Sequence, residues 1–243
     1  MSSFYGNAYK NVSDIKGPTG FYTLMVDGKT LQVFVDQDYS GGGWVCVLAN
    51  RAYTGGMNNL TYTNAINGCN YRTGGSNNGS NTLITTPTKL SGLSNYNIFI
   101  GLRYWKFLSG RQTSGKMTMV QFVSGSNGTA LSATSSHNKR YRWTSNYFNG
   151  TYGFNGVAGV SDETGTGSPG MYSYHASNSF SMSTYDLDQD QNGGNCSTYY
   201  NNNPWWYGSC WSGNYFAGGG YQDAPYWDGS GSDYYQYGAV YIK

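Results

Sequence analysis

Alternating hydrophobic and polar positions recur along the chain and predict short β-strands. Two such runs, 20–25 and 30–35, flank Asp27-Gly28, a residue pair that favours a tight hairpin turn. Four further apolar runs predict strands at 43–48, 97–101, 116–123 and 238–242. Short helices are predicted near 88–93 and around Val160.

Two stretches lack this periodicity. Residues 52–81 are rich in Asn, Gly and Thr and predict a loop excursion. Between Asp186 and Asp233, Gly, Asn, Asp and aromatic residues replace the alternating pattern. A long irregular segment inside a compact domain is usually functional, or is held by something other than strand pairing. We therefore expect the functional residues to lie in this second stretch.

The composition narrows the class of protein. Only 11% of the 243 residues are charged and the net charge is +2, so the sequence predicts neither nucleic-acid binding nor attraction to an anionic membrane. No apolar run is long enough to predict membrane insertion. The abundant Gly, Asn, Ser and Tyr would suit a disordered chain, but the recurring strand-like runs argue against it. No secretory signal is visible. We expect an extracellular protein, which was either secreted with removal of a signal or carried outside on a virion or particle surface.

Asp186, Asp188 and Asp190 form a carboxylate cluster. In an extended segment, alternating residues share one face at a spacing of roughly 7 Å. Like charges this close repel one another unless a cation neutralises them. Oxygen ligands on a Gly- and Asn-rich loop suit Ca²⁺. A solvated acidic turn is the alternative. An EF-hand is excluded, because Gln191 and Ser197 occupy the positions that require Gly and Glu.

The four cysteines allow two disulfides. Cys196 and Cys210 flank a short loop, and a bridge there would stabilise the fold by about 3 kcal/mol by restricting the unfolded chain. The remaining pair is Cys46 and Cys69, which would join a strand to the Asn- and Gly-rich excursion. Four free thiols are the alternative, but an extracellular location favours two bridges. The absence of Cys-x-x-Cys and the presence of only two His residues argue against a zinc site.

Four motifs, in a fixed order over nearly the whole sequence, are the basis of a resemblance to a known family. They are Gly41-Gly-Gly-Trp44, Asn97-Ile-Phe-Ile-Gly-Leu102, Asp186-x-Asp188-x-Asp190, and Asn195-Cys196 followed by Trp205-Trp206-Tyr207 and Cys210. The chain resembles the fibrinogen C-terminal-related domain, which is shared by fibrinogen chains, ficolins, tachylectin 5-type lectins and, more distantly, intelectins. The resemblance implies an α+β fold with a twisted antiparallel sheet, few short helices and a long irregular, calcium-stabilised C-terminal subdomain.

The resemblance also implies that the chain is organised as one domain, 1–243. Its expected parts are N-terminal strands (1–50), the Asn- and Gly-rich excursion (51–95), a central sheet region (96–185), the calcium loop and recognition subdomain (186–237) and a closing strand (238–243).

The resemblance assigns roles to residues of the irregular segment. It implies Ca²⁺ bound by the side chains of Asp188 and Asp190 and by the backbone carbonyls of Asn192 and Gly194, with Asp186 outside the first ring of ligands. It also makes Cys196–Cys210 the family's C-terminal disulfide, and it matches the Asn195–Cys196 peptide to one that is cis in many members.

A ligand pocket is implied beside this loop. Aromatic faces with amide and hydroxyl groups suit a sugar, and Tyr, Ser, Gly and Asn also serve as contacts to protein targets. At least one of Trp205 and Trp206 is expected in the core. Many members have His where this protein has Trp211, which is a departure from the acetyl-binding pattern. The expected ligand-binding residues are Asn195, Cys196, Tyr199, Trp211, Asn214, Tyr215 and Tyr234.

The function predicted from these features is calcium-stabilised extracellular recognition of a cell-surface glycan or acetylated ligand. The alternative is a protein-binding or structural tip module of a phage or microbial fibre, and self-association stays open. A glycosidase built on Asp223, Asp228 and Asp233 is less favoured, because no Gly-x-Ser-x-Gly or Walker motif appears and calcium would occupy the neighbouring carboxylates. We predict that the protein is not an enzyme.

Overall fold

The computed structural model covers the protein with gaps. It describes residues 8–51, 59–73, 96–109, 116–124, 138–146, 154–155, 158–162, 179–208, 210, 213–214, 226–227 and 237–243. Trp211, Tyr215, Tyr234 and the helix predicted at 88–93 lie outside these ranges, as do Asp223, Asp228 and Asp233.

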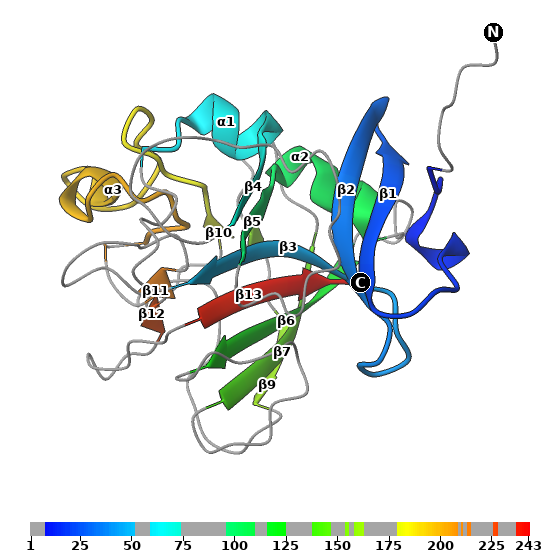
Figure 1. Cartoon of the computed structure of the whole chain (residues 1–243). Coiled ribbons are helices and arrows are strands. Elements are labelled where there is room, and N and C mark those ends of the chain that lie inside the picture. Colours follow the sequence, from blue (N-terminus) through cyan, green and yellow to red (C-terminus); the bar gives the residue numbers. More distant parts are fainter. Residues whose placement is uncertain are drawn as a thin grey trace, which may run out of the picture.

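Nine strands among the described residues form one antiparallel sheet (Figure 1). Its main path runs β1-β2-β3-β13-β6-β7-β9, and β5, itself paired with β4, joins it at β3. All six strands predicted from the alternating and apolar runs are present. The strands are β1 (Gly20–Val26), β2 (Lys29–Asp36), β3 (Trp44–Arg51), β4 (Cys69–Thr73), β5 (Tyr96–Ile100), β6 (Lys116–Ser124), β7 (Asn138–Asn146), β9 (Ala158–Asp162) and β13 (Tyr237–Ile242).

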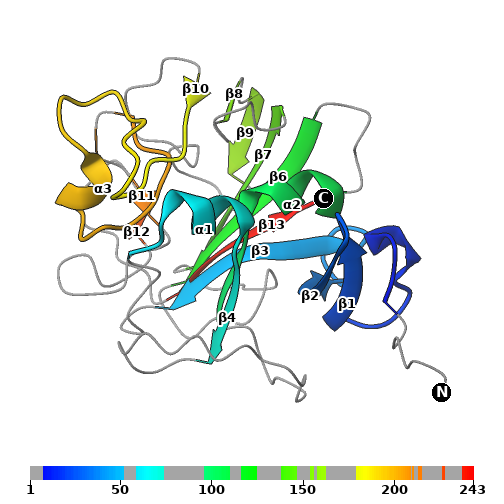
Figure 2. The same cartoon turned by 90° about the horizontal axis from the view of Figure 1, so that it is seen from above.

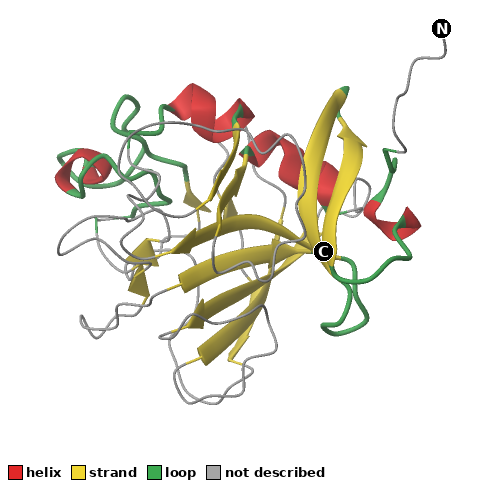
Figure 3. Cartoon of the chain, in the orientation of Figure 1, coloured by secondary structure: helices red, strands yellow, loops and turns green. Residues whose placement is uncertain are grey.

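Short elements complete the described fold. Two two-stranded sheets pair β8 (Phe154–Asn155) with β10 (Ser179–Phe180) and β11 (Gly213–Asn214) with β12 (Tyr226–Trp227). The helices are η1 (Val12–Asp14), α1 (Tyr62–Asn67), α2 (Leu102–Leu108) and α3 (Cys196–Tyr199). The prediction of an α+β fold with few short helices is confirmed, and Figure 3 shows how much of the described structure is strand.

Two local predictions are wrong. The helix expected around Val160 is strand β9, because that segment pairs with β7. The excursion expected over 52–81 contains α1 and β4. Thr61 begins α1 by accepting a hydrogen bond from the Asn64 backbone N–H, and β4 pairs with β5 along its whole length.

The β1–β2 hairpin turns where the sequence predicts. Val26 pairs with Lys29, so Asp27 and Gly28 form a two-residue turn in which both residues have positive φ, 47° and 75°. Such a turn matches the twist of the strands it joins, and glycine adopts its geometry without steric cost.

The triple-glycine segment before β3 is a second place where glycine is required. Gly42 has φ of 68°, and a Cβ there would lie 2.4 Å from the Gln37 side-chain oxygen and 2.8 Å from the Gln37 carbonyl oxygen. The same side-chain oxygen accepts a hydrogen bond from the Gly43 N–H at 2.9 Å. The Lys243 ammonium donates to the Gly42 carbonyl and lies 5.7 Å from the Trp44 ring centroid, which ties the segment to the end of β13.

The central strand of the sheet is β13. It pairs with β3 on one side and β6 on the other, and Ala239, Val240, Tyr241 and Ile242 are fully buried. Helices α1 and α2 lie over this part of the sheet, as the two perpendicular views show (Figures 1 and 2). The largest fully buried side chains are Trp105, Trp205, Trp206, Tyr104, Tyr241 and Phe99.

The expected Cys46–Cys69 disulfide is absent. Cys46 is a free, buried thiol whose sulfur donates to the Leu48 carbonyl, and burial raises its pKa. Cys46 lies on β3 and Cys69 on β4, and β5 lies between these strands. Two strand spacings are about 9–10 Å, which exceeds the Cα separation of about 7 Å that a disulfide can bridge.

Candidate functional site

The candidate site is the loop 181–208, at the end of the sheet away from the β1–β2 hairpin (Figures 1 and 2). Apart from α3 it has almost no regular structure. Ser183 and Trp205 fix the loop by exchanging two backbone hydrogen bonds of 2.9 and 3.0 Å. Trp205 and Trp206 are both fully buried, so the expectation of at least one core tryptophan is confirmed for both.

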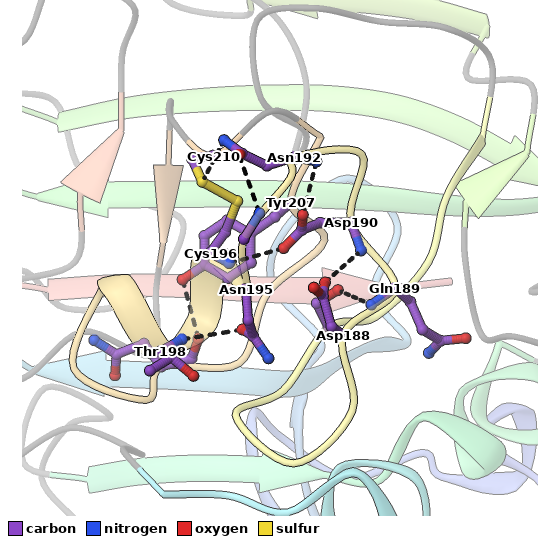
Figure 4. Close-up of a disulfide and its surroundings, with 12 residues drawn as sticks. Asp188, Gln189, Asp190, Asn192, Asn195, Cys196, Thr198, Tyr207 and Cys210 are labelled. Carbon is purple, nitrogen blue, oxygen red and sulfur yellow. Dashed lines mark hydrogen bonds between the residues drawn. A yellow bond between two sulfur atoms is a disulfide. The ribbon is translucent and has the colours of Figure 1, made fainter.

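Asp190 lies at the centre of the loop's hydrogen bonds (Figure 4). Its Oδ2 accepts the Cys196 backbone N–H at 2.9 Å, and its Oδ1 accepts the Asn192 N–H at 2.9 Å. Its own N–H donates to Oδ1 of Asp188 at 3.2 Å. The Asp190 carboxylate therefore joins the segment around Asn192 to the start of α3, and the Asp190 backbone N–H holds the Asp188 carboxylate next to it.

The electrostatics of this pair are unfavourable. Burial raises the pKa of Asp190, the hydrogen bonds from Cys196 and Asn192 oppose that shift, and the neighbouring Asp188 charge adds to it. Asp188 is exposed. Between Lys or Arg and Asp or Glu, the described residues form one salt bridge, Arg103–Asp27, and it involves neither carboxylate. Among the residues that the structure describes, no Lys or Arg therefore forms a salt bridge with the Asp188 or Asp190 carboxylate.

Asp186 makes different contacts from Asp188 and Asp190. Thr184 and Leu187 exchange backbone hydrogen bonds, so Asp186 lies at a tight turn and not on the extended face that alternation assumes. Its Oδ1 accepts the Tyr62 N–H at 2.9 Å and the Thr184 hydroxyl at 2.7 Å. Asp186 thus connects the loop to the first turn of α1. This contact is not predicted by the sequence pattern, because α1 lies in the segment that the pattern predicts to be a loop excursion.

The disulfide Cys196–Cys210 closes the loop. The two Cα atoms are 5.1 Å apart, Cys196 is fully buried, and the Asn192 side-chain amide donates to the Cys210 sulfur at 3.1 Å. The Asn195–Cys196 peptide is trans, so the cis expectation is wrong. The trans peptide lets Asn195 serve as the N-cap of α3 while the Cys196 N–H donates to Asp190.

The predicted ligand-binding residues fall into four groups. The Asn195 amide is used internally, accepting from the Thr198 N–H and donating to the Thr184 carbonyl, and the Cys196 side chain is buried. Tyr199 is 75% exposed. Asn214 lies on β11, where the backbone is described, and the remaining three predicted residues lie outside the described ranges.

Tyr199 is the outermost member of an aromatic row. Its ring meets Tyr200 edge-on at 4.9 Å, and Tyr200 stacks on the buried Tyr207 at 5.9 Å with an interplanar angle of 23°. The row connects the exposed Tyr199 ring to the core. Backing of this kind limits the movement of an exposed ring and prepares its face for a ligand.

The residues present fit a calcium ion better than a transition metal. Among the described residues, no three His, Cys, Asp or Glu side chains are grouped so as to hold a metal by themselves. Calcium accepts backbone carbonyls beside carboxylates, and the exposed loop residues Asn192 and Gly194 follow directly after the Asp188–Asp190 pair. The donor chemistry is therefore compatible with calcium if the backbone contributes ligands.

The sheet, the disulfide-closed loop and the buried Trp pair define a class of protein. The sequence profile described as "Fibrinogen beta and gamma chains, C-terminal globular domain" matches residues 8–239. The chain belongs to this family. Its members are binding modules, typically extracellular, that recognise proteins or other ligands.

Two solved structures with this fold are the fibrinogen-like globe domains of human ANGPTL6 and human ANGPTL2. The first is 19% identical, with a TM-score of 0.64 and coverage of 99% of this chain and 98% of that chain. The second is 18% identical, with a TM-score of 0.61 and coverage of 96% and 95%. At this identity the likeness establishes the fold. Among curated protein sequences, none matches this chain. Over the residues that the structure describes, no helix is long and apolar enough to span a bilayer.

Proposed function

We propose that this protein is a calcium-stabilised extracellular recognition domain that binds glycans or acetylated groups on a cell surface. The observation that carries the proposal is the Asp188–Asp190 pair, which forms no salt bridge with any Lys or Arg in the described part of the chain. The pair lies on a loop that is closed by a disulfide and also contains the exposed Tyr199. A cation bound to this loop would relieve the repulsion between the two carboxylates. The exposed Tyr199 ring beside the loop would then provide a surface for a ligand.

The ion would be held by the carboxylates of Asp188 and Asp190 and by the backbone carbonyls of Asn192 and Gly194. When bound, calcium would supply positive charge that relieves the repulsion between the two carboxylates. The protein's own contribution is positional. Asp190 already receives N–H groups from Asn192 and Cys196, so the same carboxylate sets the path of the loop and the start of α3.

Removal of calcium is expected to lower the melting temperature by about 5–10 °C. Saturation at about 100 times the dissociation constant adds about 2.7 kcal/mol, and a domain of this size shifts by about 2–4 °C per kcal/mol. Thermal unfolding with EDTA, and after Ca²⁺ is restored, measures the change. The double variant Asp188→Asn, Asp190→Asn should lose the response. An identical melting temperature with and without EDTA would remove calcium from the proposal.

Ligand recognition is expected to depend on Tyr199. An exposed aromatic ring packs against the C–H face of a sugar, and its loss should weaken binding about tenfold. A glycan array probed with and without Ca²⁺ tests this for the Tyr199→Ala variant. Met25→Ala is the matched control, because Met25 is a 43% exposed apolar side chain on the distant β1 strand. Binding that Tyr199→Ala leaves unchanged would place the ligand elsewhere.

A protein target is the second candidate, and the aromatic row favours it equally. Tyrosines held by their neighbours provide large contact area at low cost in conformational entropy. Three results together would favour a protein target over the lectin proposal. No glycan on the array would bind, protease treatment of the cells would abolish binding to their surface, and Tyr199→Ala would weaken that binding.

A further inference from the structure

Two Asn-Gly pairs among the described residues occupy opposite environments. Asn67-Gly68 ends helix α1, and Asn192-Gly193 lies in the exposed loop between Asp190 and the disulfide. Asn is among the chemically labile residues of proteins, and a following glycine offers the least steric resistance to rearrangement. The contacts of the two pairs determine which of them can react.

We propose that Asn192 is a site of spontaneous modification, at which its side-chain amide is converted to a carboxylate through a cyclic imide. In the first step the Gly193 backbone nitrogen loses its proton and attacks Cγ of Asn192. A bond forms between these two atoms, the bond between Cγ and Nδ2 breaks, and Nδ2 leaves as ammonia. Water then opens the imide at one of its two carbonyls, which gives aspartate or isoaspartate.

The attacking group is available at Gly193. In the described structure its N–H donates no hydrogen bond, and an added Cβ would meet nothing within 4 Å. Its proton can therefore leave, and the backbone has space to rotate. At Gly68 the N–H donates to the Asn64 carbonyl at 2.7 Å, and a Cβ would lie 2.5 Å from that same oxygen. The Asn67-Gly68 pair therefore has neither a free N–H nor free space.

The Asn192 side chain lies against the backbone that follows it. Oδ1 of Asn192 accepts the Gly194 N–H at 3.3 Å, so the side chain folds back over the peptide that contains the attacking nitrogen. That hydrogen bond also polarises the carbonyl. The departing NH₂ is held by the Cys210 sulfur, a weak acceptor, at 3.1 Å. Asn192 is exposed, so water reaches the imide.

Both amide atoms of Asn67 are also hydrogen-bonded, but its partners are a charged guanidinium and a carbonyl oxygen, which are stronger than the backbone N–H and the sulfur that contact Asn192. Its Oδ1 accepts from the Arg103 guanidinium at 3.1 Å, and its Nδ2 donates to the Thr63 carbonyl at 3.1 Å. Reaction there requires the end of α1 to open first, and hydrogen bonds to charged groups are the stronger kind. In the folded protein we expect Asn67 to react about tenfold or more slowly than Asn192.

Modification of Asn192 would change the proposed metal loop. The aspartate product adds a third carboxylate to the Asp188–Asp190 pair, and the isoaspartate product reroutes the backbone whose carbonyl is expected to face the ion. This consequence rests on the proposed function, whereas the reaction itself does not. If calcium binds the loop, it should slow the conversion by holding the backbone of residues 192–194.

The test is peptide mapping by mass spectrometry after incubation of the folded protein at mildly alkaline pH. The readout is the mass gain of replacing NH₂ by OH, at Asn192 and Asn67 in the same sample. Asn192 should convert about tenfold faster than Asn67 in the folded protein and at a similar rate in denaturant, where both are plain Asn-Gly pairs. Asn192→Gln should stop conversion at this position, and Gly193→Ala should slow it.

Equal rates at Asn192 and Asn67 in the folded protein, or no conversion at Asn192, would overturn the proposal. Rapid conversion at Asn192 that Ca²⁺ leaves unchanged would support the modification site while counting against the calcium proposal. Conversion that Ca²⁺ slows would support both.

Discussion

Replacing Trp206 by alanine is expected to lower the free energy of unfolding by about 3–5 kcal/mol, the range for removing a large aromatic side chain from a packed core. Trp206 is fully buried, with its ring centroid 5.9 Å from that of Trp105 on α2 and 5.3 Å from that of Trp205. It therefore packs the loop 181–208 against the helix that covers the sheet. Its loss leaves a cavity at the contact that holds the candidate site to the rest of the domain.

Denaturant unfolding of the protein measures this change. Trp206→Phe retains an aromatic ring and should cost less than the alanine variant. Tyr199→Ala is the surface control and should stay within about 0.5 kcal/mol, because that tyrosine is 75% exposed. A loss below about 1 kcal/mol for Trp206→Ala would mean that the loop does not depend on this contact.

Removing the Cys196–Cys210 disulfide should cost about 3 kcal/mol. The bridge joins residues 14 apart in sequence, and closing a loop of this length restricts the unfolded chain by about that amount. The double variant Cys196→Ala, Cys210→Ala tests this by denaturant unfolding. Reductant should destabilise the unmodified protein by a similar amount and have no further effect on the double variant. A double variant that still responds to reductant would reveal a second disulfide and contradict the free state of Cys46.

Local pattern accounts for the parts of the fold that could be predicted. Six strands were found because each is an alternating or a continuous apolar run. The continuous runs belong to strands that are buried on both faces, as at residues 44–50, 98–100 and 239–242. Strand β7 was missed because it contains Lys139, Arg140 and Arg142 in place of an apolar alternation. It is a strand because it pairs with β6 over nine residues. The segment around Val160 was misassigned for the same reason, since its pairing with β7 is a tertiary contact.

In the candidate site, too, the features that are local in sequence could be predicted and the long-range contacts could not. The spacing of Asp188 and Asp190 and the Cys196–Cys210 pair are local in sequence, so they could be identified before the fold was known. The link from Asp186 to Tyr62 spans 124 residues and leaves no trace in local sequence. The Cys46–Cys69 pairing came from assigning the two remaining cysteines to each other, and such an assignment cannot detect that β5 lies between their strands.

The central position of β13 has a consequence for how the protein is made. Strands β3 and β6 belong to two halves of the sheet that are joined through β13, which contains residues 237–242. The ribosome releases these residues after all the other strands of this sheet. Until β13 is released, both halves of the sheet have an unpaired edge. The sheet therefore closes only after synthesis has passed residue 242. A nascent polypeptide that stalls earlier has two open edges, each able to pair with another molecule.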